Sequence, residues 1–364
     1  MSEVLKANKG EWSEFYTLLK LLADQKLYSA DEELNALRDL FYPILKIITA
    51  KDSDKEKAYE LDGSDTIKII NSQTGNITSI KRSTIAARVK EIFMAIKNGR
   101  ESSFEIPIAE EILINLERPV IKGYSHKKSD IVVVLHDLKT NSKNELGYSI
   151  KSQIGGASTL LNAGNTTNFI YELINFKGAF EDINKIDSRS KVRDRIKAIY
   201  ESGASLKFSD MESKIFEDNL AKTDSLLPSL VAEMVLTYYR HTAISVPDIN
   251  KYLNESFVLL PGKKPSLGFY EFKIKHMLMN MALGGLTPGR PWDGLLDASG
   301  GYIIVKEDGE IVCYHIFNQD AFRNYLYKNT KLETASTSRY GFGSVYEESG
   351  KHYIKLNLQI RFTD

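Results

Sequence analysis

Hydrophobic positions recur along the chain with two periods, one typical of amphipathic helices and the other of strands. In residues 11–23 the apolar side chains fall three or four positions apart, which predicts a helix with one buried face. We expect a second helix over 31–49, with Asp31 as its N-cap. A third is expected to begin at Ser83 and to end near Asn98. Between these two, short β-branched runs on either side of a turn predict a hairpin.

The middle of the chain has the pattern of an α/β protein. A helical segment at 106–116 precedes a short edge strand at 120–124. The β-branched run 130–135 predicts a buried strand, and 146–153 predicts the strand that returns beside it. A glycine-rich link then leads to a helix that is expected to end near Phe176.

The last third mixes long apolar helices with strands. Helices are expected at 228–241 and 268–283, and the turn Asp308-Gly309 predicts a hairpin between two apolar strands. We therefore expect an α/β fold in which helices flank a mixed sheet. The regions are an N-terminal helical region with a hairpin at 1–100, a core at 101–226 and a C-terminal α+β portion at 227–364.

Composition restricts the class of protein. The 364 residues are 42% apolar and 26% charged, as in an ordinary globular protein. A single cysteine, Cys313, excludes an internal disulfide and a cysteine-based zinc site. No apolar run could span a membrane and residues 1–10 lack a signal-peptide core, so we expect a cytoplasmic protein with no membrane partner. The net charge of +0 argues mildly against nucleic-acid binding, although catalytic carboxylates can mask a local basic cleft.

The informative pair is Asp130 and Lys151, on two adjacent antiparallel strands of the expected core. Cleavage of a phosphodiester requires a divalent metal that polarises the phosphate and lowers the pKa of an attacking water. Mg²⁺ prefers oxygen ligands and keeps several waters, so that one or two carboxylates suffice. A lysine beside the metal can orient the nucleophile or stabilise developing negative charge. These residue types on neighbouring strands favour a metal-dependent site for phosphodiester cleavage.

The strand that carries Lys151 has one polar face. Side chains alternate along a strand, so Ser149, Lys151 and Gln153 are predicted to point to the same side, as they would in an open cleft. The same pattern is typical of an edge strand with a solvated outer face, and Asp130 at a strand start can simply cap a turn. From the residues alone, both interpretations stay open.

The order Asp…Ser-x-Lys resembles the PD-(D/E)xK nuclease core, in the variant in which serine replaces the second acid. Longer stretches, which together span nearly the whole chain, resemble the HpaII family of type II restriction endonucleases. They are GEWSEFYTLLKLLAD at 10–24, SHKKSDIVV at 125–133, LGYSIKSQIGGASTLLNAGNTTNFIYEL at 146–173, WDGLLDASGGYIIV…GEIVCYHIF at 292–317 and RYGFGSVYEE…KLNLQIRF at 339–362.

The resemblance implies a bacterial cytoplasmic enzyme that cuts double-stranded DNA at a short palindrome with Mg²⁺ as cofactor. The enzyme after which the family is named reads CCGG and cuts after the first C, so CCGG is the expected site. A companion DNA methyltransferase is implied because the host genome must be protected. A palindrome favours a homodimer, although some such enzymes act as monomers.

The chain departs from the motif at two positions. Ser129 stands in place of the proline, and Ser149 stands where a second acid is expected. Related Ser-x-Lys nucleases take a carboxylate from the following helix, which makes Glu172 the first candidate and Glu14, on the N-terminal helix, the second. For each, an ordinary glutamate on a surface helix is the alternative. The predicted catalytic residues are Asp130, Ser149, Lys151, Gln153, Glu172 and Glu14, and the predicted metal ligands are Asp130, Glu172 and Ile150.

Contacts with DNA are expected from basic side chains at phosphates and from arginine or amide groups at base edges. The predicted DNA-binding residues are Lys127, Lys128, Asn162, Asn165, Arg290 and Arg339. A solvated loop for the lysines and capping for the asparagines are the alternatives.

Two other functions stay open. A repair nuclease of the same PD-(D/E)xK type would cut without a defined sequence. A DNA-binding protein with a degenerate nuclease site is the other, because Ser149 cannot serve as a strong metal ligand. No nucleophile–base pair or phosphate loop favours hydrolysis of a small molecule.

Overall fold

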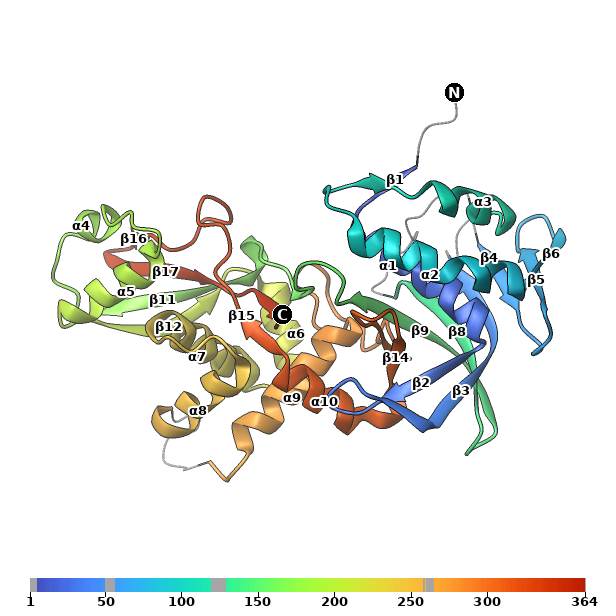
Figure 1. Ribbon diagram of the computed structural model, residues 1–364. Coiled ribbons are helices and arrows are strands. Elements are labelled where there is room, and N and C mark those ends of the chain that lie inside the picture. The colour runs from blue at the N-terminus through green and yellow to red at the C-terminus, as the bar shows by residue number, and fades with distance from the viewer. Residues whose placement is uncertain (1–4, 50–55, 119–128, 258, 260–264, 364) are drawn as a thin grey trace.

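The computed structural model describes residues 5–49, 56–118, 129–257, 259 and 265–363. These residues form a mixed α/β protein, which confirms the predicted fold class at that level. Figure 1 shows a large sheet with α1, α2 and α3 at one end of the molecule, a smaller sheet with α5, α7 and α8 at the other end, and α9 and α10 between them. None of the helices in the described ranges is both long enough and apolar enough to cross a membrane.

The large sheet has nine strands in the order β2-β14-β13-β9-β8-β3-β4-β5-β6. Because β2 also pairs with β3, six of these strands close into a ring, which the sequence did not predict. The strands are β2 (Lys26–Ala30), β3 (Ala36–Thr49), β4 (Lys57–Glu60), β5 (Thr66–Asn71), β6 (Ile77–Lys81), β8 (Ile131–Asp137), β9 (Ser142–Ser152), β13 (Gly301–Val305) and β14 (Ile311–His315). The predicted hairpins β5–β6, β8–β9 and β13–β14 are confirmed.

Three helices cover this sheet: α1 (Lys9–Asp24), α2 (Arg82–Asn98) and α3 (Pro107–Asn115). The side chain of Asn8 accepts a hydrogen bond from the Glu11 amide and the Glu11 side chain accepts one from the Asn8 amide, which fixes the start of α1. The predicted apolar face of α1, which includes Trp12 and Phe15, is completely buried. All three helices confirm the sequence predictions, although Ser83 bonds to Asp65 and does not cap α2.

A second hydrophobic core joins the remaining elements to the large sheet, since it also includes Tyr302 and Ile304 of β13 and Val312 and Tyr314 of β14. The other strands form the sheets β12-β11-β17-β16 and β10-β18-β15, and a short pair β1–β7 lies apart. The strands are β1 (Lys6–Ala7), β7 (Phe104–Glu105), β10 (Thr159–Leu161), β11 (Asn168–Ile174), β12 (Ser205–Met211), β15 (Thr330–Leu332), β16 (Val345–Glu348), β17 (Lys351–Asn357) and β18 (Ile360–Phe362). The helices are α4 (Phe180–Asn184), α5 (Lys191–Glu201), α6 (Lys214–Thr223), α7 (Leu227–Arg240), α8 (Val246–Ser256), α9 (Phe269–Leu283) and α10 (Gln319–Lys328).

Two predicted helices are strands. Residues 31–49 contain β3, because Pro43 cannot donate a helical hydrogen bond and the β-branched residues around it favour an extended chain. The helix expected to end near Phe176 is replaced by β10 and β11, in which Phe169, Tyr171 and Leu173 are buried at every second position. The edge strand predicted at 120–124 lies outside the described residues.

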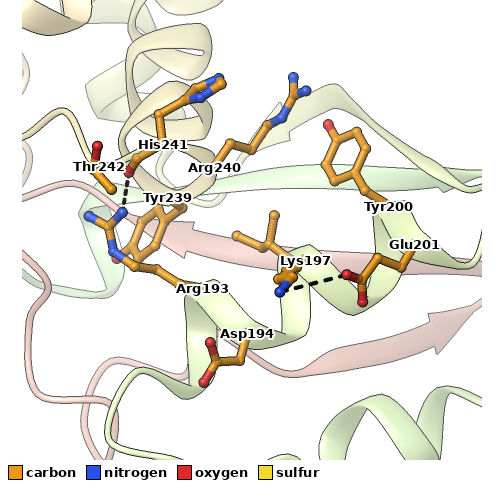
Figure 2. A pocket seen from close by; sticks show the side chains of 10 residues that line it. Arg193, Asp194, Lys197, Tyr200, Glu201, Tyr239, Arg240, His241 and Thr242 are labelled. Atoms are coloured by element: carbon orange, nitrogen blue, oxygen red, sulfur yellow. Dashed lines mark hydrogen bonds and ion pairs between the residues drawn. The ribbon is translucent and has the colours of Figure 1, made fainter.

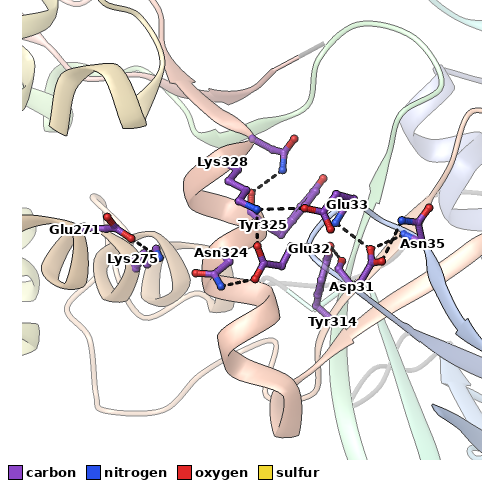
Figure 3. Close-up of polar contacts among 11 residues, drawn as sticks. Asp31, Glu32, Glu33, Asn35, Glu271, Lys275, Tyr314, Asn324, Tyr325 and Lys328 are labelled. Atoms are coloured by element: carbon purple, nitrogen blue, oxygen red, sulfur yellow. Dashed lines mark hydrogen bonds and ion pairs between the residues drawn. The ribbon is translucent and has the colours of Figure 1, made fainter. Parts of the chain in front are cut away.

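The turn between β2 and β3 connects the large sheet to α10 (Figure 3). The Asp31 carboxylate closes this turn by accepting hydrogen bonds from the amides of Glu33 and Asn35, each at 2.9 Å, and therefore caps no helix. The adjacent Glu32 accepts a hydrogen bond from the Lys328 ammonium at 2.5 Å. These contacts hold α10, which belongs to the second core, against the ring of strands.

Candidate active site

Asp130 lies directly before β8 and folds back onto β9. Its amide donates to the Tyr148 carbonyl at 2.8 Å. Its Oδ2 atom accepts hydrogen bonds from the Ile150 amide at 2.7 Å and from the Ser149 hydroxyl at 3.2 Å. The antiparallel register of the two strands therefore brings the carboxylate of Asp130 beside the segment that leads to Lys151.

The polar face of β9 is open only at one end. Ser149 is 1% exposed, and its hydroxyl is directed to Asp130 rather than to solvent. Lys151 is half-buried and Gln153 is exposed. The three side chains therefore do not share one open cleft: Lys151 and Gln153 line a hollow at the end of β9, whereas Ser149 is buried. The parallel strand β13 places Tyr302 opposite Ser149.

A cleft of about 490 Å³ begins at Lys151. Asn162 and Arg290 line it together with Asp297, whose carboxylate accepts a hydrogen bond from Arg290 at 2.7 Å. The loop that carries Asp297 packs closely on β9, since a side chain at Gly147 would come within 2.8 Å of the Asp297 carbonyl oxygen. Two of the predicted DNA-binding residues are therefore brought to the same cleft as Lys151.

Glu14 comes to the same site from α1. The neighbouring Ser13 hydroxyl donates to the Ser152 hydroxyl at 3.0 Å, which places this turn of the helix against the end of β9. Burial and, after it, the negative charge of Asp130 together raise the pKa of Glu14 from 4.5 to about 7, although Arg118 and Lys151 act in the opposite direction. Two carboxylates and two cations thus share one electrostatic environment.

This donor set fits Mg²⁺. In the described part of the chain, no three histidine, cysteine or acidic side chains gather as a ready-made metal cage. Mg²⁺ does not need one, because it usually retains water and is bound by one or two carboxylates together with substrate phosphates. Asp130 and Glu14, half-buried and mutually repelling, are the oxygen donors that a divalent cation would stabilise.

Glu172 is not brought to this site. The helix on which it was expected is strand β11, in the four-stranded sheet (Figure 1). Its carboxylate forms an ion pair with Lys351 on the adjacent strand at 2.9 Å. Glu14 therefore lies in the field of Asp130 and Lys151, whereas Glu172 belongs to another sheet.

The remaining predicted DNA-binding residues are dispersed. Asn165 opens a short 3-10 turn, and Arg339 lies in the connection before β16; both are exposed. Neither residue lines the cleft at Lys151. Lys127 and Lys128 lie outside the described residues.

A separate hollow of about 490 Å³ lies between α5 and α7 (Figure 2). Arg193, Lys197 and Arg240 line it, but Asp194 and Glu201 offset their charge. None of its lining residues belongs to β8, β9 or β13. Its lysine, Lys197, forms an ion pair with Glu201 at 3.7 Å.

Carboxylates and a lysine, beside a cleft that holds an arginine, are groups that suit a nuclease, and comparison with known proteins also gives a nuclease. The sequence model described as HpaII restriction endonuclease matches residues 8–362. The type II restriction enzyme HpaII of Haemophilus parainfluenzae is 39% identical over 363 residues, which is 100% of each chain. The chain therefore belongs to the HpaII restriction endonuclease family, and its prediction as a type II restriction endonuclease is confirmed. No solved structure matches it.

Proposed function

We propose that this chain hydrolyses double-stranded DNA at a short palindrome, CCGG, with Mg²⁺ as cofactor. The main support is that Glu14 lies in the electrostatic field of both Asp130 and Lys151, and that Lys151 lines the cleft that contains Arg290. The full-length identity of 39% to the type II restriction enzyme HpaII supports the choice of CCGG. We assign the site to the Ser-x-Lys variant of the PD-(D/E)xK nucleases.

Asp130 and Glu14 would hold the metal, with Glu14 taking the role first considered for Glu172. The Ile150 amide donates to Asp130, and the amide and carbonyl of one residue in a strand point to the same edge. The Ile150 carbonyl oxygen is therefore directed toward the side of β9 on which Asp130 lies and is our third candidate ligand. When bound, Mg²⁺ would polarise the scissile phosphate and increase the acidity of the attacking water.

The other polar residues orient the reacting groups. The ammonium group of Lys151 would hold the nucleophile and offset the negative charge that develops on the phosphate. Ser149 fixes the rotamer of Asp130 through its hydroxyl and need not contact the metal. Gln153, exposed at the end of β9, would bind a water or support Lys151.

Recognition of DNA would take place in the cleft beside Lys151. Arg290 can donate two hydrogen bonds to O6 and N7 of guanine, and Asp297 orients its guanidinium. Asn162 would contact a neighbouring base or phosphate, with Asn165 and Arg339 at the periphery. A palindromic site favours a homodimer. Cytoplasmic location in a bacterium and a companion DNA methyltransferase follow from the same proposal.

The test is digestion of a plasmid of known sequence, with Mg²⁺ and with a chelator, followed by sequencing of the ends. Discrete fragments that end within CCGG and appear only with Mg²⁺ would support the proposal. Heterogeneous ends would indicate a nuclease without a defined sequence. The second candidate, a DNA-binding protein with a degenerate site, rests on Ser149 in place of an acid; an intact plasmid that the protein still retards on a gel would favour it.

A further inference from the structure

A buried tyrosine hydroxyl lies beside the candidate active site without a hydrogen-bond partner. Tyr302, in β13, is 0% exposed. Among the described residues, no group forms a hydrogen bond with its hydroxyl. A buried polar group without a hydrogen-bond partner destabilises the fold, so phenylalanine would be the more stable residue here if packing alone mattered.

The strand register places Tyr302 on the catalytic face. In the parallel pair β13–β9, Tyr302 lies opposite Ser149 and Ile304 lies opposite Lys151. Neighbouring strands present side chains at paired positions to the same side of a sheet, so the Tyr302 ring stands on the face that carries Ser149 and Lys151. The Lys151 ammonium is 5.8 Å from the centre of that ring, within the range of a cation–π contact.

The hydroxyl is also within reach of the Asp130 charge. Burial, and after it the negative charge of Asp130, raise the pKa of Tyr302 above its ordinary value. The side chain therefore stays protonated and can only act as a neutral hydrogen-bonding group. Because its oxygen is covered by protein, it cannot contact the DNA backbone from solvent.

We propose that Tyr302 is a positioning residue of the nuclease site. Its hydroxyl donates a hydrogen bond into the group of oxygen atoms around Asp130 when the divalent cation is bound, and its ring fixes the ammonium of Lys151. This inference rests on the proposed function, since it gives Tyr302 a role in the same reaction. It also accounts for a polar atom that the packing of β13 does not require.

The chain supplies a matched control in Tyr148. This residue, in β9, is likewise 0% exposed, and its hydroxyl likewise has no hydrogen-bond partner within the described ranges. It points to the opposite face of the sheet, where its ring is 6.2 Å from that of His315. The charged forms that act on its hydroxyl are those of Cys313 and Tyr42, although its backbone carbonyl accepts the hydrogen bond from the Asp130 amide. The two tyrosines thus share burial and a missing partner and differ in the face that they occupy.

The experiment compares Tyr302→Phe with Tyr148→Phe in the full chain. Removal of an unsatisfied buried hydroxyl should leave the melting temperature of either variant unchanged or raised. We expect Tyr302→Phe to slow single-turnover cleavage of a CCGG duplex roughly 10- to 100-fold and to weaken Mg²⁺ binding, as is usual when an outer partner of a metal site is lost. Affinity for the duplex in Ca²⁺ should stay within about twofold, since the hydroxyl is covered. Tyr148→Phe should resemble the parent in every measurement.

Mg²⁺ binding to the protein is measured separately by calorimetry, so that the outcome does not depend on cleavage alone. The proposal is overturned if Tyr302→Phe cuts and binds Mg²⁺ like the parent, or if Tyr148→Phe loses as much. If the parent chain fails to cut DNA, the proposed function is wrong. The Mg²⁺ affinities of the two variants would still decide whether Tyr302 supports the Asp130 site.

Discussion

Two acid–lysine sets of this protein differ in how their charges are balanced. On β11 and β17, Glu172 and Lys351 form a direct ion pair at 2.9 Å at the surface of the four-stranded sheet. At the edge of β8 and β9, Asp130 and Glu14 repel each other, and their environment raises the pKa of Glu14 to about 7. The first set is already neutralised. In the second set, the repulsion between the two carboxylates destabilises the free protein. Binding of a divalent cation would relieve this repulsion and would therefore be most favourable there.

The largest expected effect on the cleavage rate is a difference between substitution of Lys151 and substitution of Lys351. Lys151→Ala should reduce cleavage of a CCGG duplex by roughly a thousandfold or more, because its ammonium lines the cleft in which the reacting phosphate would lie. Binding of the duplex in Ca²⁺ should persist in a gel-shift assay. Lys351→Ala, which removes the matched lysine from the paired set, should cut at nearly the parent rate. Equal activity in both variants would remove Lys151 from the mechanism.

The second prediction tests the acids in the same way. Glu14→Gln should lower the cleavage rate by about 100-fold or more, since it removes one of two proposed metal ligands, and added Mg²⁺ should restore part of the loss. Glu172→Gln should leave the rate unchanged because that carboxylate is paired with Lys351. Titration of the rate with Mg²⁺ measures both. The reverse result would restore Glu172 as the recruited acid and would require the two sheets to approach each other on DNA.

The sequence predicted the pair on adjacent strands but not the environment around it. Asp130 and Lys151 are close along the chain and joined by a hairpin, so the local pattern was sufficient to bring them together. Glu172 was the first candidate for the second acid because its segment was predicted to be a helix. The burial of every second side chain along β11 shows why that segment is a strand. Tyr302 could not be found from the sequence, because its place beside Ser149 depends on a parallel pairing between distant segments.

In the fold as well, the elements that depend on local patterns were predicted and those that depend on distant contacts were not. Helices with a clear apolar face, such as α1 and α2, were predicted because their burial follows from local periodicity. The ring of six strands also depends on the parallel pairings of β2 with β14 and of β9 with β13, and no local pattern encodes such long-range contacts. The β3 segment was misread as a helix because its apolar residues are not strictly alternating, although Pro43 argued against that interpretation.

A smaller effect is expected for the cleft beside Lys151. Arg290→Ala should lower the rate of cleavage at CCGG by about 10- to 100-fold, the usual contribution of a bidentate contact with guanine, and should reduce discrimination against single-base variants of the site. Lys197→Ala, in the hollow of Figure 2, is the control of the same type of charge removal and should have little effect. A uniform loss of binding to all sequences would assign Arg290 to phosphate contact instead.

The smallest predicted effect concerns stability, and the two glutamates should differ in sign. A folded state that holds Glu14 protonated up to about pH 7, while the unfolded carboxyl ionises near pH 4.5, loses stability as the pH rises through this interval. Glu14→Gln should therefore stabilise the metal-free protein by about 1 to 3 kcal/mol at pH 8 and have no such effect at pH 4. Glu172→Gln breaks an exposed ion pair and should cost less than about 1 kcal/mol. Urea denaturation at both pH values, in the presence of chelator, measures these changes. A Glu14→Gln variant that is less stable at pH 8 would show that other groups of the protein already stabilise the Glu14 carboxylate. Glu14 would then not need a cation to offset its charge.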